Sequence, residues 1–205
     1  MDRDWLAAVS TLRDAALTAA FKVISLIGGP LGATILIAVL AVFLLLARRW
    51  RTALFLALVQ ACGSTCSTLI KHLVLRPRPA HPLVSADIGS FPSGHVITTL
   101  GVGIALAVAL TRPGSGRRLA LAAVAAATAL MMLVRTYLGA HWLSDTFEGL
   151  LVGAGVAFLL WWVFAPWLAS DRARGWQLRL PRPPRAKAEA AAAQPAADPE
   201  RSPGR

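Results

Sequence analysis

Five segments of this chain stay predominantly apolar for long enough to cross the roughly 30 Å hydrocarbon core of a bilayer. They cover residues 28–47, 52–72, 95–111, 119–136 and 143–166. The hydrophobic content of the whole chain is 56%, above the roughly 45–50% that is usual in soluble domains. The pattern predicts an all-α integral membrane protein, built as a helical bundle of five to six transmembrane helices.

The two ends of the chain differ from this apolar middle. Residues 5–22 have apolar positions at helical spacing with charges on the other side, which suits an interfacial helix or a poor sixth span. The C-terminal end is rich in Pro, Ala and charge, with no apolar period. We therefore expect an N-terminal interfacial or partial membrane helix (1–27), a transmembrane domain (28–168) and a disordered basic cytoplasmic tail (169–205).

The positive charge of the chain indicates its orientation in the membrane. A formal net charge of +11 would suggest nucleic acid in a soluble protein. Here the basic residues fall in clusters at 48–51 and 112–118 and in the tail, as they do in cytoplasmic loops. We expect no nucleic-acid partner. The N-terminus and segments 73–94 and 137–142 then face the extracellular or periplasmic side.

Ionisable side chains collect at the segment ends on that outer face. Ionisable groups at membrane depth are costly and usually face a functional cavity. Lys71, Arg78 and Arg135 have no equal number of acids nearby, which favours a multiply charged anion such as phosphate. Two simpler interpretations stay open. Lys71 and Arg78 could be interfacial anchors, and Arg135 could form a structural ion pair with Asp145.

Two short motifs supply candidate catalytic groups. In "PSGH", at the start of the third apolar segment, Ser93 and the Gly94 amide can bind a phosphate oxygen at a helix N-terminus. His141 and Asp145 share one helical face, and a carboxylate on one ring nitrogen leaves the other as a nucleophile. His95 can protonate the departing oxygen and later activate water. These residues predict phosphotransfer without a metal or another cofactor.

The motifs resemble the three-part signature of the type 2 phosphatidic acid phosphatase superfamily, which also includes soluble bacterial acid phosphatases and vanadium haloperoxidases. Its parts, KxxxxxxRP, PSGH and SRxxxxxHxxxD, correspond here to "KHLVLRPRP" (71–79), "PSGH" (92–95) and "VRTYLGAHWLSD" (134–145). The resemblance covers roughly residues 20–165. One departure is Val134, where the family usually has Ser, so one possible hydroxyl contact to phosphate is lost.

The resemblance implies a role for each matching residue. His141 would be the nucleophile that forms a phosphohistidine, Asp145 its orienting group and His95 the acid on the leaving group. The phosphate would be bound by Lys71, Arg78, Ser93, Gly94 and Arg135.

The resemblance also implies a substrate and a location. The transmembrane domain would be a phosphatase that acts in the cell inner membrane, with its site facing outward. Its partners would be the bilayer and a lipid phosphate such as phosphatidic acid, phosphatidylglycerol phosphate or a polyprenyl diphosphate. A vanadate-dependent haloperoxidase on the same scaffold and a non-catalytic lipid-phosphate binder or transporter are the alternatives.

Overall fold

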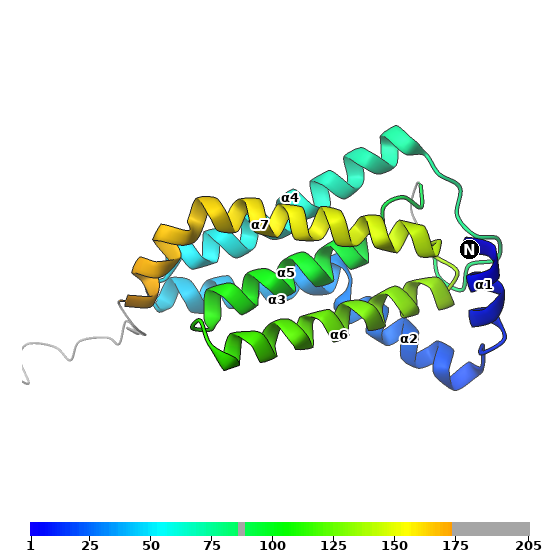
Figure 1. The fold of residues 1–205 in the computed structure, drawn as a ribbon, viewed down its shortest axis with the longest axis horizontal. Coiled ribbons are helices and arrows are strands. Elements are labelled where there is room, and N and C mark those ends of the chain that lie inside the picture. The colour runs from blue at the N-terminus through cyan, green and yellow to red at the C-terminus, as the bar shows by residue number, and fades with distance from the viewer. Residues whose placement is uncertain (86–88, 174–205) are drawn as a thin grey trace, which may run out of the picture.

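The computed structural model of the chain describes residues 1–85 and 89–173 and is helical throughout its regular parts (Figure 1). The all-α prediction is confirmed: the described residues contain no strand. The helices are α1 (Asp2–Ser10), α2 (Ala15–Gly28), α3 (Pro30–Leu46), α4 (Trp50–Val74), α5 (Gly94–Leu110), α6 (Ser115–Tyr137) and α7 (Leu143–Ala173). Of the predicted tail, residues 169–173 still belong to α7, and 174–205 lie outside the described residues.

Helix α5 lies inside the bundle, where it packs against α4, α6 and α7 (Figure 1). The contact between α5 and α7 is close because α7 presents glycines to it. A Cβ atom at Gly153 would lie 2.8 Å from the carbonyl oxygen of Ile97, and one at Gly149 would lie 3.0 Å from the carbonyl oxygen of Ser93. Small residues at these positions bring the two helix backbones together. They thereby hold the start of α7 against the start of α5.

The prediction of one helix over residues 5–22 is wrong, because this segment contains two helices. Helix α1 ends at Ser10 and α2 begins at Ala15. The Asp14 carboxylate accepts a hydrogen bond from the Leu17 backbone N–H at 3.0 Å, and such an N-cap stabilises a new helix start. Helix α1 lies across the end of the bundle, next to the N-terminus (Figure 1).

The five predicted apolar segments each correspond to a helix, and the first of these helices belongs to a bent pair. By length and composition, α4, α6 and α7 can each cross a membrane, and α5 is a shorter apolar helix. Helices α2 and α3 meet at a bend of 46° and can together count as a fourth span. Pro30 begins α3 and lacks the N–H that would continue the α2 hydrogen-bond ladder. The predicted span 28–47 is therefore the second half of a broken pair.

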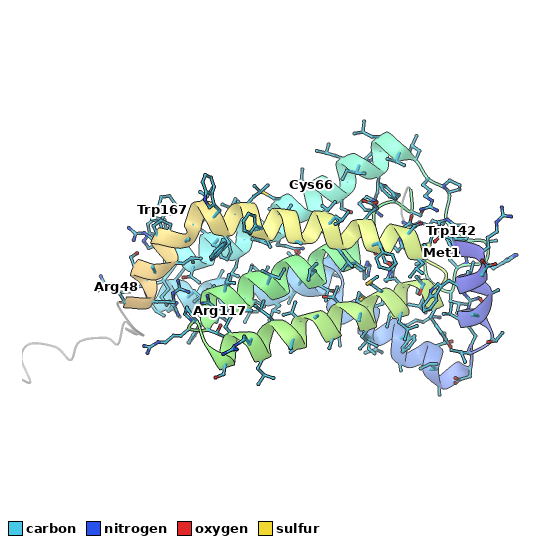
Figure 2. All side chains as sticks on the ribbon, in the orientation of Figure 1. Met1, Arg48, Cys66, Arg117, Trp142 and Trp167 are labelled. Atoms are coloured by element: carbon cyan, nitrogen blue, oxygen red, sulfur yellow. The ribbon has the colours of Figure 1, made fainter. Side chains whose placement is uncertain are left out.

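The two ends of the bundle carry different groups. Arg48, Arg117 and Trp167 lie towards one end, while Met1 and Trp142 lie at the other (Figure 2). The predicted basic clusters therefore share one end of the fold. The predicted site lies towards the opposite end.

Candidate active site

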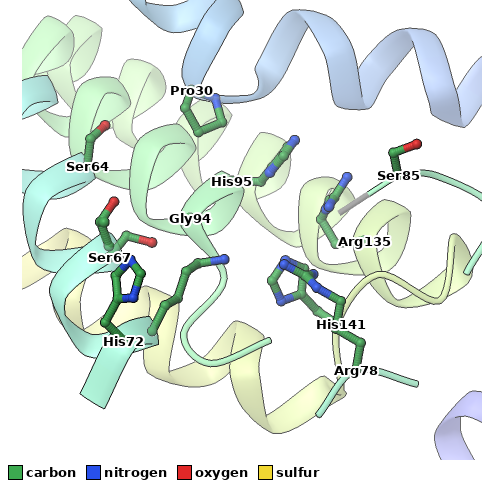
Figure 3. Close-up of a pocket in the computed structure, with 12 residues that line it drawn as sticks. Pro30, Ser64, Ser67, His72, Arg78, Ser85, Gly94, His95, Arg135 and His141 are labelled. Atoms are coloured by element: carbon green, nitrogen blue, oxygen red, sulfur yellow. The ribbon is translucent and has the colours of Figure 1, made fainter. Parts of the chain in front are cut away.

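A cavity of about 550 Å³ lies between the α2–α3 bend, the C-terminal half of α4, the start of α5 and the end of α6 (Figure 3). The predicted site residues that line it are Lys71, Arg78, Gly94, His95, Arg135 and His141. They come from three helices and two connections, which are far apart in the sequence. The fold thus brings most of the predicted site into one place.

Helix ends position these side chains. Lys71 lies in the last turn of α4 and Arg135 in the last turn of α6, whereas Gly94 and His95 begin α5. His141 follows a sharp turn between α6 and α7, in which Gly139 has a φ of +67°. Glycine adopts this left-handed conformation without steric cost. The turn therefore directs the chain back so that His141 lines the cavity.

Arg135 is a buried cation without an acidic partner among the described residues. Arg135 is only 5% exposed. Its Nη1 donates a 2.6 Å hydrogen bond to the Ser25 hydroxyl. Its Nε is buried and has no hydrogen-bond partner among those residues. The alternative of an ion pair with Asp145 is wrong, because Asp145 pairs with Arg76 instead. A buried charge of this kind is costly unless it is paired, so an anion in the cavity would stabilise it.

The other two predicted phosphate-binding cations, Lys71 and Arg78, each contact a backbone carbonyl. Arg78 Nη1 donates to the Ala140 carbonyl at 2.5 Å, and Lys71 Nζ lies 3.4 Å from the Gly89 carbonyl. These contacts help to orient both side chains. Together with Arg135, they give the cavity a positive lining.

His141 is oriented by a backbone carbonyl that the sequence did not indicate. Its Nδ1 lies 2.6 Å from the Ser90 carbonyl oxygen and 3.7 Å from Asp145 Oδ2. A carbonyl can only accept, so Nδ1 carries the proton and Nε2 keeps its lone pair. Burial lowers the pKa of His141 to about 4, the Asp145 carboxylate partly opposes this, and the nearby cations reinforce it. The ring is therefore neutral at pH 7 and can act as a nucleophile.

Asp145 is fully buried and belongs to a network that reaches the N-terminal helix. Its Oδ1 accepts from Arg76 Nη1 at 2.5 Å, and its Oδ2 accepts from the Trp142 backbone N–H at 2.9 Å. Arg76 Nη2 in turn donates to Asp2 at 2.9 Å. Asp2 also accepts hydrogen bonds from the backbone N–H and the hydroxyl of Ser144. Neither Arg76 nor Asp2 carried a predicted role.

The network also stabilises the charged form of Asp2. Burial raises the pKa of its carboxyl, but the hydrogen bonds from Ser144 and the charge of Arg76 outweigh this, and the net pKa lies below its usual value. Asp2 is therefore an anion at neutral pH. It balances one side of the Arg76 guanidinium while Asp145 balances the other.

Neither Ser93, a predicted phosphate ligand, nor Val134, the departure from the family pattern, lines the cavity. Ser93 is fully buried, is absent from the cavity lining, and its Oγ has no hydrogen-bond partner among the described residues. Val134 is also fully buried and packs in an apolar cluster with Phe21 and Met131. The hydroxyl next to Arg135 comes from Ser25 on α2, more than a hundred residues away in the sequence.

The family of the chain follows from a comparison with known families. The model of the PAP2 superfamily matches residues 52–168, more than half of the 205 residues. The chain belongs to the PAP2 superfamily. This confirms the resemblance seen in its three motifs.

Two curated relatives share part of this region. They are decaprenylphosphoryl-5-phosphoribose phosphatases of Mycobacterium tuberculosis strains CDC 1551 / Oshkosh and H37Rv. Each is 30% identical over 99 residues, which cover 46% of this chain and 51% of the relative. The match thus spans about half the length of these relatives.

Two solved structures share the fold. A transmembrane PAP2 type phosphatidylglycerolphosphate phosphatase from Bacillus subtilis superposes with a TM-score of 0.75 at 23% identity, over 80% of this chain and 85% of that one. LpxE from Aquifex aeolicus gives a TM-score of 0.64 at 20% identity, over 78% and 93% of the two chains. The helical architecture is therefore that of membrane PAP2 proteins.

Proposed function

We propose that this chain is a metal-independent phosphatase that hydrolyses a lipid phosphate monoester or diphosphate through a phosphohistidine. The observation that carries the proposal is the pair of buried groups at the cavity. His141 has Nδ1 bound to a carbonyl, which leaves Nε2 as a nucleophile, and Arg135 is a cation without an acidic partner among the described residues. Fixed cations around the transferred group stabilise the charge of the transition state.

The reaction would take place in two steps. His141 Nε2 attacks the phosphorus, the bond from phosphorus to the leaving oxygen breaks, and His95 gives that oxygen a proton. His95 then takes a proton from a water molecule, which attacks the phosphorus and breaks the bond to His141. Inorganic phosphate leaves, and both histidines return to their starting states. Asp145, 3.7 Å from His141 Nδ1, stabilises the positive charge on the ring of the intermediate.

The membrane setting and the relatives support a proposal for the substrate class and the location. Two relatives are phosphatases of decaprenylphosphoryl-5-phosphoribose and of phosphatidylglycerolphosphate. Phosphatidylglycerol phosphate, phosphatidic acid and a polyprenyl diphosphate are the candidate substrates here. The basic clusters favour an inner-membrane protein with the site on the outer face and the tail in the cytoplasm.

Phosphate release from these lipids by the purified protein in detergent tests the function. We expect steady release, lost by a factor on the order of 10³ or more in His141→Ala. His81→Asn, in an exposed residue outside the cavity lining, is the matched control and should keep its rate. Lipid binding without release by the unmodified chain would contradict the proposal and favour a binder. Halide oxidation with vanadate would favour a haloperoxidase.

A further inference from the structure

The cavity has two chemically different sides. Arg78, Arg135 and His141 lie on one side, Ser64, Ser67 and His72 lie on the opposite side, and His95 lies between them (Figure 3). The second side belongs to α4, where Ser64, Ser67 and Thr68 line the cavity. Positions separated by three and four residues share one face of a helix. Helix α4 thus presents a row of hydroxyl groups to the cavity, which we call the hydroxyl wall (Ser64, Ser67 and Thr68).

Two members of the hydroxyl wall, Ser67 and Thr68, differ from several other helical hydroxyls that the structure describes. Thr34, Thr128 and Thr136 each donate to a carbonyl of their own helix, at 2.7, 2.7 and 2.9 Å. No hydrogen bond joins the hydroxyl of Ser67 or Thr68 to any residue that the structure describes. Ser67 is only 5% exposed. Ser67 also lines the cavity, so its unused hydroxyl is suited to a polar ligand there.

The third member of the hydroxyl wall, Ser64, can donate a hydrogen bond to a ligand. Ser64 Oγ accepts a hydrogen bond from Gln60 Nε2 at 3.3 Å. Because its oxygen is used as an acceptor there, its proton is available to a ligand. The buried Gln60 Oε1 has no partner among the described residues either. The polar surface of α4 is therefore incompletely satisfied by the protein alone.

The direction of attack determines which part of a substrate meets this wall. In a phosphoryl transfer, the attacking and leaving atoms lie roughly in line on opposite sides of phosphorus. With His141 as the attacking group, the leaving oxygen would face the opposite side of the cavity, where Ser64 and Ser67 lie beyond His95 (Figure 3). A cavity of about 550 Å³ lies within the roughly 300–1,000 Å³ of small-molecule sites. It has room for the atoms that follow the leaving oxygen.

We propose that Ser67 and Thr68, with Ser64 beside them, bind free hydroxyl groups of the leaving alcohol. This inference rests on the proposed phosphatase function and narrows its substrate class. The preferred substrate is a lipid whose phosphate is esterified to a polyol, such as a glycerol or sugar head group. When a polyprenyl diphosphate is cleaved instead, the leaving group is a polyprenyl phosphate, which carries no free alcohol hydroxyl for these side chains to bind.

The test compares two lipids that differ by one hydroxyl group. They are phosphatidylglycerol phosphate and its deoxy analogue phosphatidyl-1,3-propanediol phosphate, with identical acyl chains. We expect the protein to cleave the first with a kcat/KM about 5- to 10-fold higher, the range of one hydrogen bond. In Ser67→Ala/Thr68→Val, that ratio should fall to near one while cleavage of the deoxy lipid continues. Thr65→Val, in an exposed residue of α4 outside the cavity lining, should keep the ratio.

Three results would overturn the inference or separate it from the proposed function. Equal kcat/KM for the two lipids in the unmodified chain would contradict the hydroxyl wall, as would equal losses for both lipids in the double variant. Absence of release from either lipid would instead contradict the phosphatase function. In that case, equilibrium binding of the two lipids to His141→Ala still decides the inference. Equal affinities there would overturn it, and tighter binding of the hydroxyl-bearing lipid would support it.

Discussion

At the scale of single residues, Arg76 connects the N-terminal helix to the carboxylate beside the candidate nucleophile. Its two terminal nitrogens contact Asp145 and Asp2. A charged hydrogen bond on each side fixes the plane of the guanidinium. The orientation of Asp145, and through it the field at His141, therefore depends on a residue near the start of the chain.

Replacing Asp2 with Asn tests this dependence. The amide keeps the size of the side chain but removes the charge that faces Arg76, so Asp145 should be held less firmly. We expect kcat for phosphate release to fall about 3- to 10-fold, the range of indirect couplings, with little change in KM. Asp4→Asn is the control, because Asp4 lies on the same helix and is exposed, and it pairs with the N-terminal amine at 2.9 Å. Equal kcat values in the two variants would contradict a role of Asp2 in orienting Asp145.

The protonation of His141 gives a second prediction. With a pKa of about 4 in the folded state against an ordinary value of about 6.5, the unfolded chain takes up this proton first as the pH falls. The contribution of His141 to stability is thus present above pH 6.5 and is lost towards pH 4. NMR of ¹⁵N-histidine-labelled protein, assigned by comparison with His141→Gln, should show this ring titrating near pH 4. Titration near pH 6.5 would contradict its buried placement. The charged groups that act on it are Asp145, Arg135, Arg78 and Lys71.

Some of these residues could be predicted from the sequence and others could not. His141, Asp145 and Arg135 were predicted because their chemistry lies in their side chains at fixed motif spacing. The partner of His141 is the Ser90 carbonyl, and a backbone group has no signature in the sequence. Ser25 reaches Arg135 from a different helix, which no local pattern indicates.

At the scale of helices, the close crossing of α5 and α7 holds two parts of the site together. The start of α5 carries His95, and the start of α7 carries Asp145. The Ser93 backbone N–H also donates to the Asp145 carbonyl at 3.0 Å. Any change that separates these helices should affect both stability and phosphate release.

Gly153→Ala tests the crossing. Its new Cβ would lie 2.8 Å from the Ile97 carbonyl oxygen, and such overpacking costs about 1–3 kcal/mol. We expect a lower Tm in detergent and slower phosphate release. Gly155→Ala is the matched control on the same helix, because a Cβ there meets no atom within 4 Å. Its Tm should be unchanged or higher, since Ala favours helices over Gly. The same Tm in both variants would contradict the close crossing.

Hydropathy predicted the long helices better than the N-terminal ones. Helices α4, α6 and α7 are uniformly apolar over most of their length, so an average over residues locates them. The start of α2 depends on the hydrogen bond that the Asp14 carboxylate accepts from the Leu17 N–H, and the bend before α3 depends on Pro30. Single residues of this kind decide helix boundaries but hardly change an average.

At the scale of the whole molecule, the fold separates a basic end from the end that holds the candidate site. The basic end is fixed by polar contacts between helices. Asp171 accepts hydrogen bonds from the backbone N–H and the hydroxyl of Thr52, and Arg172 donates to the Val108 carbonyl. These hydrogen bonds join α4, α5 and α7 at this end. The basic clusters at 48–51 and 112–118 therefore lie on the same side of the bundle. The positive-inside rule then applies to the bundle as a unit.

Cysteine labelling in intact cells tests the resulting orientation. Cys62 and Cys66 form no disulfide, so a Cys62→Ala/Cys66→Ala background provides a chain without thiols. We expect a membrane-impermeant maleimide to label His81→Cys, near the candidate site, in intact cells. It should label Gly116→Cys, in the first turn of α6 where a side chain meets no neighbour, only after permeabilisation. The reverse pattern would place the cavity on the cytoplasmic face. Its substrate would then have to come from the inner leaflet, although the chemistry of His141 and its cations would be unchanged.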